Sequence, residues 1–140
     1  MSSPSDFKFL GYVVSKVEFE LKNEFFTQND FKYDQAIDIQ QNFNAENNRF
    51  VEVLLNIKIA NEKESFNFLL SIRGGFEANK EMPEELFRSL YTVNAPAILY
   101  PFARAIITTY TAQANIPPII LPAVNFMPNP PMPPQDKPKV

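Results

Sequence analysis

Two pairs of acidic residues are the first candidates for chemistry in this sequence. Glu18 and Glu20 alternate with apolar residues, and Glu84 and Glu85 follow a proline. Close carboxylates can act as a general acid and base, or hold a hard cation. Here the alternation puts the first pair on the wet face of a strand, and the second pair suits the positive end of a helix dipole. We therefore interpret both pairs as solvated charges.

The other residues that catalysis commonly uses are missing. The 140-residue chain has no His and no Cys, which excludes disulfides, thiolate nucleophiles, the usual zinc ligand sets and Ser–His or Cys–His pairs. Gly74 and Gly75 lie outside any GxGxxG or GKS/T pattern, so we interpret them as a turn that ends a strand rather than as a phosphate loop. We expect no enzymatic activity, no cofactor and no metal site.

Composition limits the fold and the partners. Apolar residues make up 45% of the chain, which is enough to build the core of one globular domain. A formal charge of −3 gives no basic footprint, so nucleic acid is not an expected partner. The sequence has no uninterrupted apolar window of transmembrane length and no signal-peptide pattern at its start. We expect a cytoplasmic protein that does not insert into a membrane.

Four segments alternate apolar and polar residues with the period of a half-buried strand. They are residues 15–23, 36–44, 49–61 and 65–76. The links 44–49 and 60–65 are short and polar, which predicts two antiparallel hairpins in a sheet with one wet and one buried face. The link 23–34 is longer and carries four aromatic residues, which is unusual for a connector that runs over the surface.

Helix signals follow the strands. Residues 82–85, MPEE, are typical of a helix start and predict a short helix. A longer helix is predicted over 97–113, where Pro101 is tolerated only in the first turn or as a kink. Between residues 94 and 126 the sole charge is Arg104, whereas a surface helix normally has a charged stripe. One helix face can cover the sheet, and the other face therefore predicts contact with a second subunit.

Two further segments are rich in proline. Residues 115–126, NIPPIILPAVNF, are apolar and uncharged, and their prolines exclude a regular helix or a central strand. Together with the aromatic connector and the uncharged helix, this ribbon predicts a contiguous apolar surface of the kind that marks an interaction site. Residues 127–140 are predicted to form a disordered tail, which leaves 1–126 as the folded domain.

The helix and the ribbon together resemble the signature of the SecB family of protein-export chaperones. The matching residues are Ile98, Leu99, Pro101, Phe102, Ala103, Arg104, Pro117, Pro122, Val124, Asn125 and Phe126. The order of elements over residues 7–126 is also similar. The resemblance implies an α+β fold with a four-stranded antiparallel sheet and one short and one long helix packed on one face. It also implies a homo-oligomer built as a dimer of dimers. The tail prolines predict that the second long helix of the family is missing here.

As to function, the resemblance implies an ATP-independent holdase that binds unfolded or preprotein clients in apolar grooves, for protein export. The family passes clients to the SecA motor through an acidic sheet face. Here Glu18 and Glu20 are the candidate docking residues. Two other positions that are acidic in the family align with Lys16 and with a position near Ser71 in this chain. The resemblance therefore implies holdase activity more directly than SecA docking. The alternatives are a SecB-like chaperone dedicated to one client, such as an antitoxin, a non-chaperone oligomeric adaptor, and a carrier of small apolar ligands.

Two sets of site residues follow from position. The connector and the ribbon supply the predicted client-binding residues, which are Phe25, Phe26, Phe31, Tyr33, Phe76, Ile116, Ile119, Ile120 and Leu121. The long helix supplies the predicted oligomer interface, which is formed by Tyr100, Ala103, Ile107, Tyr110 and Thr111.

Overall fold

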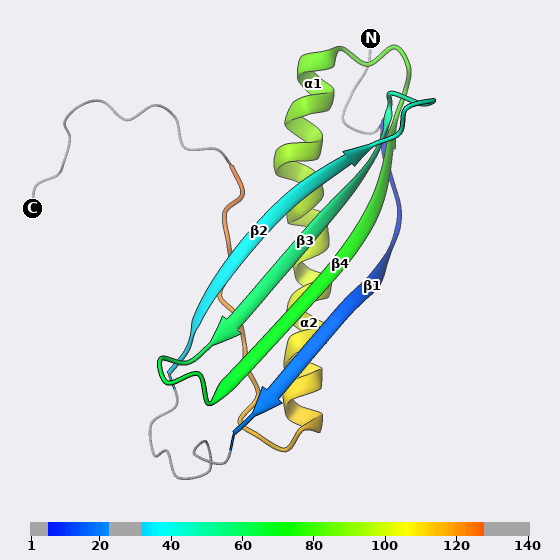
Figure 1. Cartoon of the computed structure of the whole chain (residues 1–140). Coiled ribbons are helices and arrows are strands. Elements are labelled where there is room, and N and C mark those ends of the chain that lie inside the picture. The colour runs from blue at the N-terminus through cyan, green and yellow to red at the C-terminus, as the bar shows by residue number, and fades with distance from the viewer. Residues whose placement is uncertain (1–5, 23–31, 128–140) are drawn as a thin grey trace, which may run out of the picture.

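The computed structural model describes residues 6–22 and 32–127 (Figure 1). Its elements are β1 (Phe7–Leu21), β2 (Asp34–Phe43), β3 (Phe50–Ala60), β4 (Phe66–Ala78), α1 (Glu84–Ser89), the π-helical turn η3 (Leu90–Asn94) and α2 (Ala95–Gln113). A single twisted sheet lies in front of one long helical segment, which confirms the α+β prediction. The predicted client residues Phe25, Phe26 and Phe31 lie outside the described residues, as do residues 128–140 of the predicted tail.

The sheet is antiparallel throughout, and its spatial order is β1-β4-β3-β2. Strands β2 and β3, and strands β3 and β4, form the two predicted hairpins. Strand β1 then pairs with β4 rather than with its sequence neighbour β2. Strands β1 and β2, which follow each other in the sequence, are therefore the two edges of the sheet.

The core lies between the sheet and α2. Alternate side chains of β3 and β4 point to this side and are fully buried, as the period of two requires. From α2, Leu99, Ala103 and Ile107 recur every four residues along one helix face and have no exposed surface. Burial of each large aliphatic side chain contributes about 1.5–3 kcal/mol, so this layer is the main source of stability.

The glycine pair does not end the fourth strand, and that prediction is wrong. Strand β4 continues through Gly74 and Gly75 to Ala78. A Cβ atom at position 74 would lie 2.5 Å from Leu99 Cδ2, which is closer than any normal contact. Gly74 is therefore required because the backbone of β4 and the α2 side chain lie in direct contact there.

Strand β1 begins at Phe7, well before the predicted start at residue 15. Its pairing with β4 shifts register twice, between Phe9 and Gly11 and between Val14 and Lys16. Gly11 has φ 115°, a conformation open to glycine, at the first of these bulges. Each bulge adds one residue and so exchanges which residues face the core.

The predicted short and long helices are joined end to end. Pro96 near the start of α2 has no N–H to donate to the carbonyl four residues earlier, and the π-helical turn η3 immediately precedes it. Pro101 lies inside α2, which continues through it to Gln113. No helix among the described residues is long and apolar enough to cross a membrane.

Candidate functional site

The ribbon leaves α2 through a specific helix-ending motif. The N–H of Ile116 donates to Thr111 O, and the N–H of Asn115 donates to Ala112 O, at 3.4 and 3.1 Å. Asn115 has φ 63°, the left-handed conformation that this Schellman arrangement requires after the helix and that Asn tolerates better than most residues. The motif turns the chain back along α2, where the ribbon runs beside the helix (Figure 1).

Three hydroxyl groups of α2 hold the ribbon by its backbone. The Tyr100 hydroxyl donates to the carbonyl of Pro122 at 2.6 Å, and the Thr108 hydroxyl donates to the carbonyl of Ile119 at 2.6 Å. The N–H of Ile119 donates to Thr111 Oγ1 at 3.0 Å. The prolines of the ribbon have no N–H of their own, so side chains rather than a sheet ladder satisfy the backbone here.

The ribbon exposes only part of the predicted client surface. Ile116, Ile119 and Leu121 are at most 6% exposed and belong to the core of their own chain, whereas Ile120 is 68% exposed. Phe76 is fully buried between the rings of Phe7 and Phe9, with ring centroids 5.3 and 5.2 Å away. Tyr33 is half-buried against the same core. Within the described chain, Ile120 is therefore the predicted client residue that offers the most free surface.

The predicted interface residues also divide into two groups. Tyr100, Ala103, Ile107 and Thr111 are at most 4% exposed because they face the sheet and the ribbon of their own chain. Tyr110 is 40% exposed and lies on another side of the helix. The first four are thus already covered within one chain, and Tyr110 keeps free surface for a partner.

A second apolar stripe of α2, which the sequence reasoning missed, lies beside Tyr110. It forms an open groove of about 430 Å³ toward β1. The lining residues are Tyr12, Phe102, Ala105, Ile106, Thr109, Tyr110 and Gln113. The ring of Phe102 lies 4.6 Å from that of Tyr12, and the ring of Tyr110 lies 5.3 Å from that of Phe19. We call this surface the open groove; the spacing of Phe102, Ile106 and Tyr110 by four residues was the signal for it.

Strand β1 extends the open groove with two exposed valines. Val14 and Val17 pair with Ile72 and Leu70, whose side chains face the core. Both valines therefore lie on the α2 side of the sheet, at its β1 edge, and are 44% and 38% exposed among the described residues. The residues that line the open groove carry no charge, and the two valines add apolar surface on the strand that contributes Tyr12 to it.

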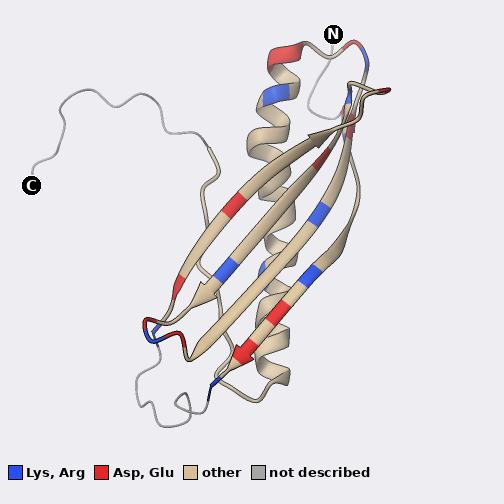
Figure 2. Ribbon diagram, in the orientation of Figure 1, with Lys and Arg blue, Asp and Glu red and all other residues tan. Residues whose placement is uncertain are grey.

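The opposite face of the sheet is polar and carries charges of both signs (Figure 2). The predicted docking residues Glu18 and Glu20 are exposed on β1, and Glu18 forms an ion pair with Lys16 at 3.3 Å. Arg73 on β4 lies 3.8 Å from Glu52 on β3. Basic residues thus lie among the acidic residues of this face. This agrees with the sequence, in which two acidic positions of the family are replaced at Lys16 and near Ser71.

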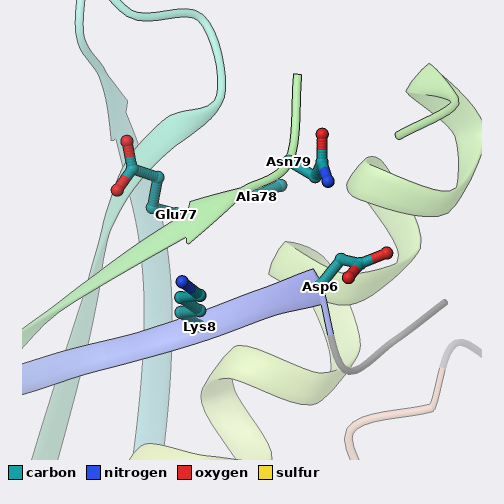
Figure 3. A pocket seen from close by; sticks show the side chains of 5 residues that line it. All are labelled: Asp6, Lys8, Glu77, Ala78 and Asn79. Carbon is teal, nitrogen blue, oxygen red and sulfur yellow. The ribbon is translucent and has the colours of Figure 1, made fainter. Parts of the chain in front are cut away.

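A small polar pocket lies at the end of the sheet where β1 begins. Asp6, Lys8, Glu77, Ala78 and Asn79 line a volume of about 230 Å³ (Figure 3). Glu77 also accepts a hydrogen bond from Asn47 Nδ2 at 2.8 Å, so one of its oxygens is already used. The described residues contain no group of three or more Asp, Glu, His or Cys side chains that could hold a metal ion. Among the described residues, those that line this pocket therefore form no metal site.

Comparison with known proteins identifies the family. The family model for preprotein translocase subunit SecB matches residues 5–128 of the 140 residues of the chain. The chain belongs to the SecB family. A protein-export protein SecB of Hyphomonas neptunium is 27% identical over 129 residues, which cover 90% of this chain and 77% of the relative. An uncharacterized protein of Methanocaldococcus jannaschii is 36% identical over 125 residues, which cover 84% of this chain and 78% of the relative.

The SecB fold is also found among solved structures. A SecB-like chaperone of Mycobacterium tuberculosis, solved with a ChAD peptide from the antitoxin HigA1, superposes with a TM-score of 0.70. The match covers 86% of this chain and 89% of that one, at 11% sequence identity. The predicted four-stranded sheet and long helix are thus those of a SecB-like protein, although few residues are shared.

Proposed function

We propose that this SecB-family chain is an ATP-independent holdase of the cytoplasm that binds unfolded polypeptide clients on apolar surfaces and serves protein export. The observation that carries the proposal is the apolar surface on both flanks of α2, where the ribbon flank also holds Arg104 over the ring of Tyr100. On one flank the open groove is lined by aromatic and aliphatic side chains. On the other flank Ile120 stands out from the ribbon. Such surfaces bind apolar chain segments with little side-chain selectivity.

The two flanks have different roles in this proposal. The open groove, with Val14 and Val17 beside it, is flat and continuous, which suits a second copy of the chain in a homo-oligomer. The ribbon side carries the exposed Ile120 and is the proposed client side. Strand β2, a free edge with regular pairing to β3, can add backbone hydrogen bonds to an extended client.

Ile120→Asp is expected to weaken client capture about tenfold while the chain stays folded, because the side chain is exposed and a charge there opposes apolar contact. The measurement is suppression of aggregation of a chemically unfolded client at stoichiometric ratio without nucleotide. Leu10→Asp is the matched control, since Leu10 is 54% exposed but lies at Gly75 on the polar face. Two results together would support the adaptor class instead: the wild-type protein does not suppress aggregation, and the Ile120→Asp variant no longer forms the oligomer.

The mixed charge of the open sheet face favours a second candidate, a SecB-like chaperone dedicated to one client without delivery to SecA. Lys16 neutralises Glu18, and Arg73 sits within the same face (Figure 2). Docking through an acidic patch relies on long-range charge, which is weakened when both signs alternate within a Debye length of about 8–10 Å.

On this basis, pull-down with SecA at low salt is expected to recover little protein. The double variant Lys16→Glu with Arg73→Glu is expected to increase SecA binding about tenfold, since it replaces two basic charges of this face by acidic ones. Strong binding by the wild-type protein, unchanged in the double variant, would contradict the dedicated-client candidate and favour export.

A further inference from the structure

Helix α2 has two apolar flanks, and only one of them is open. The open groove lies on the flank of Phe102 and Tyr110. The other flank, with Tyr100, Thr108 and Thr111, is covered by the ribbon of the same chain. The covered flank offers three hydroxyl groups that bind the backbone of an extended segment, so the ribbon occupies a position on α2 that another extended apolar chain could occupy.

The contacts that hold the ribbon are not specific to its sequence. All three hydroxyl bonds reach backbone atoms, two carbonyls and one N–H, which every polypeptide has. The side chains that anchor the ribbon are plain aliphatics, namely Ile119 and Leu121, each 1% exposed, with Ile116 at the start. An extended client with apolar residues at similar spacing can therefore make the same bonds.

The ribbon is also attached separately from the helix. In the described part of the chain, backbone-to-backbone hydrogen bonds end with that of Ile116. Beyond it, three side-chain hydrogen bonds, the buried Ile119 and Leu121, and the partly buried Val124 and Phe126 hold the segment, with the Phe126 ring 5.6 Å from that of Tyr100. A segment held by few contacts opens more easily than the helix and strands beneath it.

We propose that the ribbon is a releasable strap, which opens from residue 117 onward and regulates client capture by competing for the covered flank of α2. This inference rests on the proposed holdase function. When the strap opens, the hydroxyls of Tyr100, Thr108 and Thr111 become free to bind the backbone of a client. The apparent affinity for a client is then the affinity of the open form multiplied by the fraction of time that the strap is open.

Thr111→Val in the full chain tests the strap. The variant keeps the shape of the side chain but loses the acceptor for the Ile119 N–H. We expect hydrogen exchange of the Ile119 amide to accelerate about tenfold, while the amides of Leu99 and Ile107 in α2 keep their wild-type rates. Thr108→Val, at a half-buried position, should accelerate the same exchange.

Both hydroxyls would also bind a client, so client affinity is measured with Leu121→Ala, which removes a buried anchor of the ribbon and leaves α2 unchanged. We expect this variant to bind an unfolded client about tenfold more tightly.

Thr92→Val is the matched control. The Thr92 hydroxyl bonds to the carbonyl of Arg88 four residues earlier, as Thr111 does to Ile107, but it does not touch the ribbon. It should change neither ribbon exchange nor affinity. Equal exchange rates for Ile119 and the α2 amides in the wild type would overturn the strap. Faster ribbon exchange in Leu121→Ala with unchanged client affinity would overturn its regulatory role. If no variant captures a client, the holdase function and the regulation fail together, while the exchange rates still decide whether the ribbon opens alone.

Discussion

Gly74→Val is expected to destabilise the folded chain by about 3 kcal/mol, because overpacking a rigid core forces side chains off their rotamers. The first added carbon would already meet Leu99 Cδ2 at 2.5 Å and Leu99 Cγ at 3.2 Å. Leu99 is fully buried between α2 and the sheet and has little room to turn away. The measurement is the midpoint and slope of urea unfolding at fixed protein concentration.

The neighbouring glycine supplies the control. A Cβ atom at Gly75 would make only ordinary contacts, 3.6 Å from the Phe50 ring and 3.8 Å from Leu10, so Gly75→Val should stay within about 1 kcal/mol of wild type. Adding Leu99→Ala to Gly74→Val should cost less than the sum of the two single changes, by about 1–3 kcal/mol. Strict additivity would contradict the contact between this strand and α2.

Phe102→Asp combined with Ile106→Asp is expected to give a folded monomer. Phe102 is 38% exposed and lines the open groove with Ile106, so the charges face solvent in one chain but would be buried between two. Central apolar anchors in an interface contribute about 2 kcal/mol each, so association should weaken about a thousandfold. Size-exclusion chromatography with light scattering over a range of concentrations gives the mass directly.

Ser89→Asp with Thr92→Asp is the matched double variant, since both residues are exposed on the helical segment outside the open groove. This control should keep the mass of the wild type. An unchanged mass for the Phe102 and Ile106 variant, with intact helical circular dichroism, would place the subunit contact elsewhere on the chain.

Strands β3 and β4 were predictable because their side chains alternate without a break. Strand β1 was only half predicted, and the reason is physical. Phe7 and Phe9 pair with core-facing positions of β4, so odd-numbered residues of β1 face the core at first. After the first bulge, the even-numbered Tyr12 faces the core, and after the second bulge the odd-numbered Val17 does so again. The alternation of apolar and polar residues changes phase at each bulge and is therefore lost when it is averaged over the whole strand. Only the regular stretch after the second bulge could be recognised as a strand.

The sequence did not predict which side chains of the helix and the ribbon face outward. The sequence pointed to the uncharged helix and the ribbon, and both lie together in the structure. Helical spacing alone does not say which of two apolar stripes meets the sheet, so Ala103 and Ile107 were assigned to a partner although they pack on their own sheet. Likewise, the sequence Ile119-Ile120 does not show which of the two side chains is buried, because the segment has no regular period. The hydrogen bonds of Thr108 and Thr111 to the backbone of Ile119 fix the orientation in which Ile119 is buried.

The two bulges of β1 also bear on how copies of the chain can accumulate. A sheet with two regular edges could join edge to edge, β1 of one copy to β2 of the next, and such a head-to-tail contact has no closure and grows into fibres. Strand β2 pairs regularly along its length, but β1 shifts register twice and carries Gly11 in a conformation that bends the strand. The β1 edge is therefore irregular, and a regular strand such as β2 of another copy cannot pair along its whole length. This irregularity protects a chain with exposed apolar surface from edge-to-edge polymerisation.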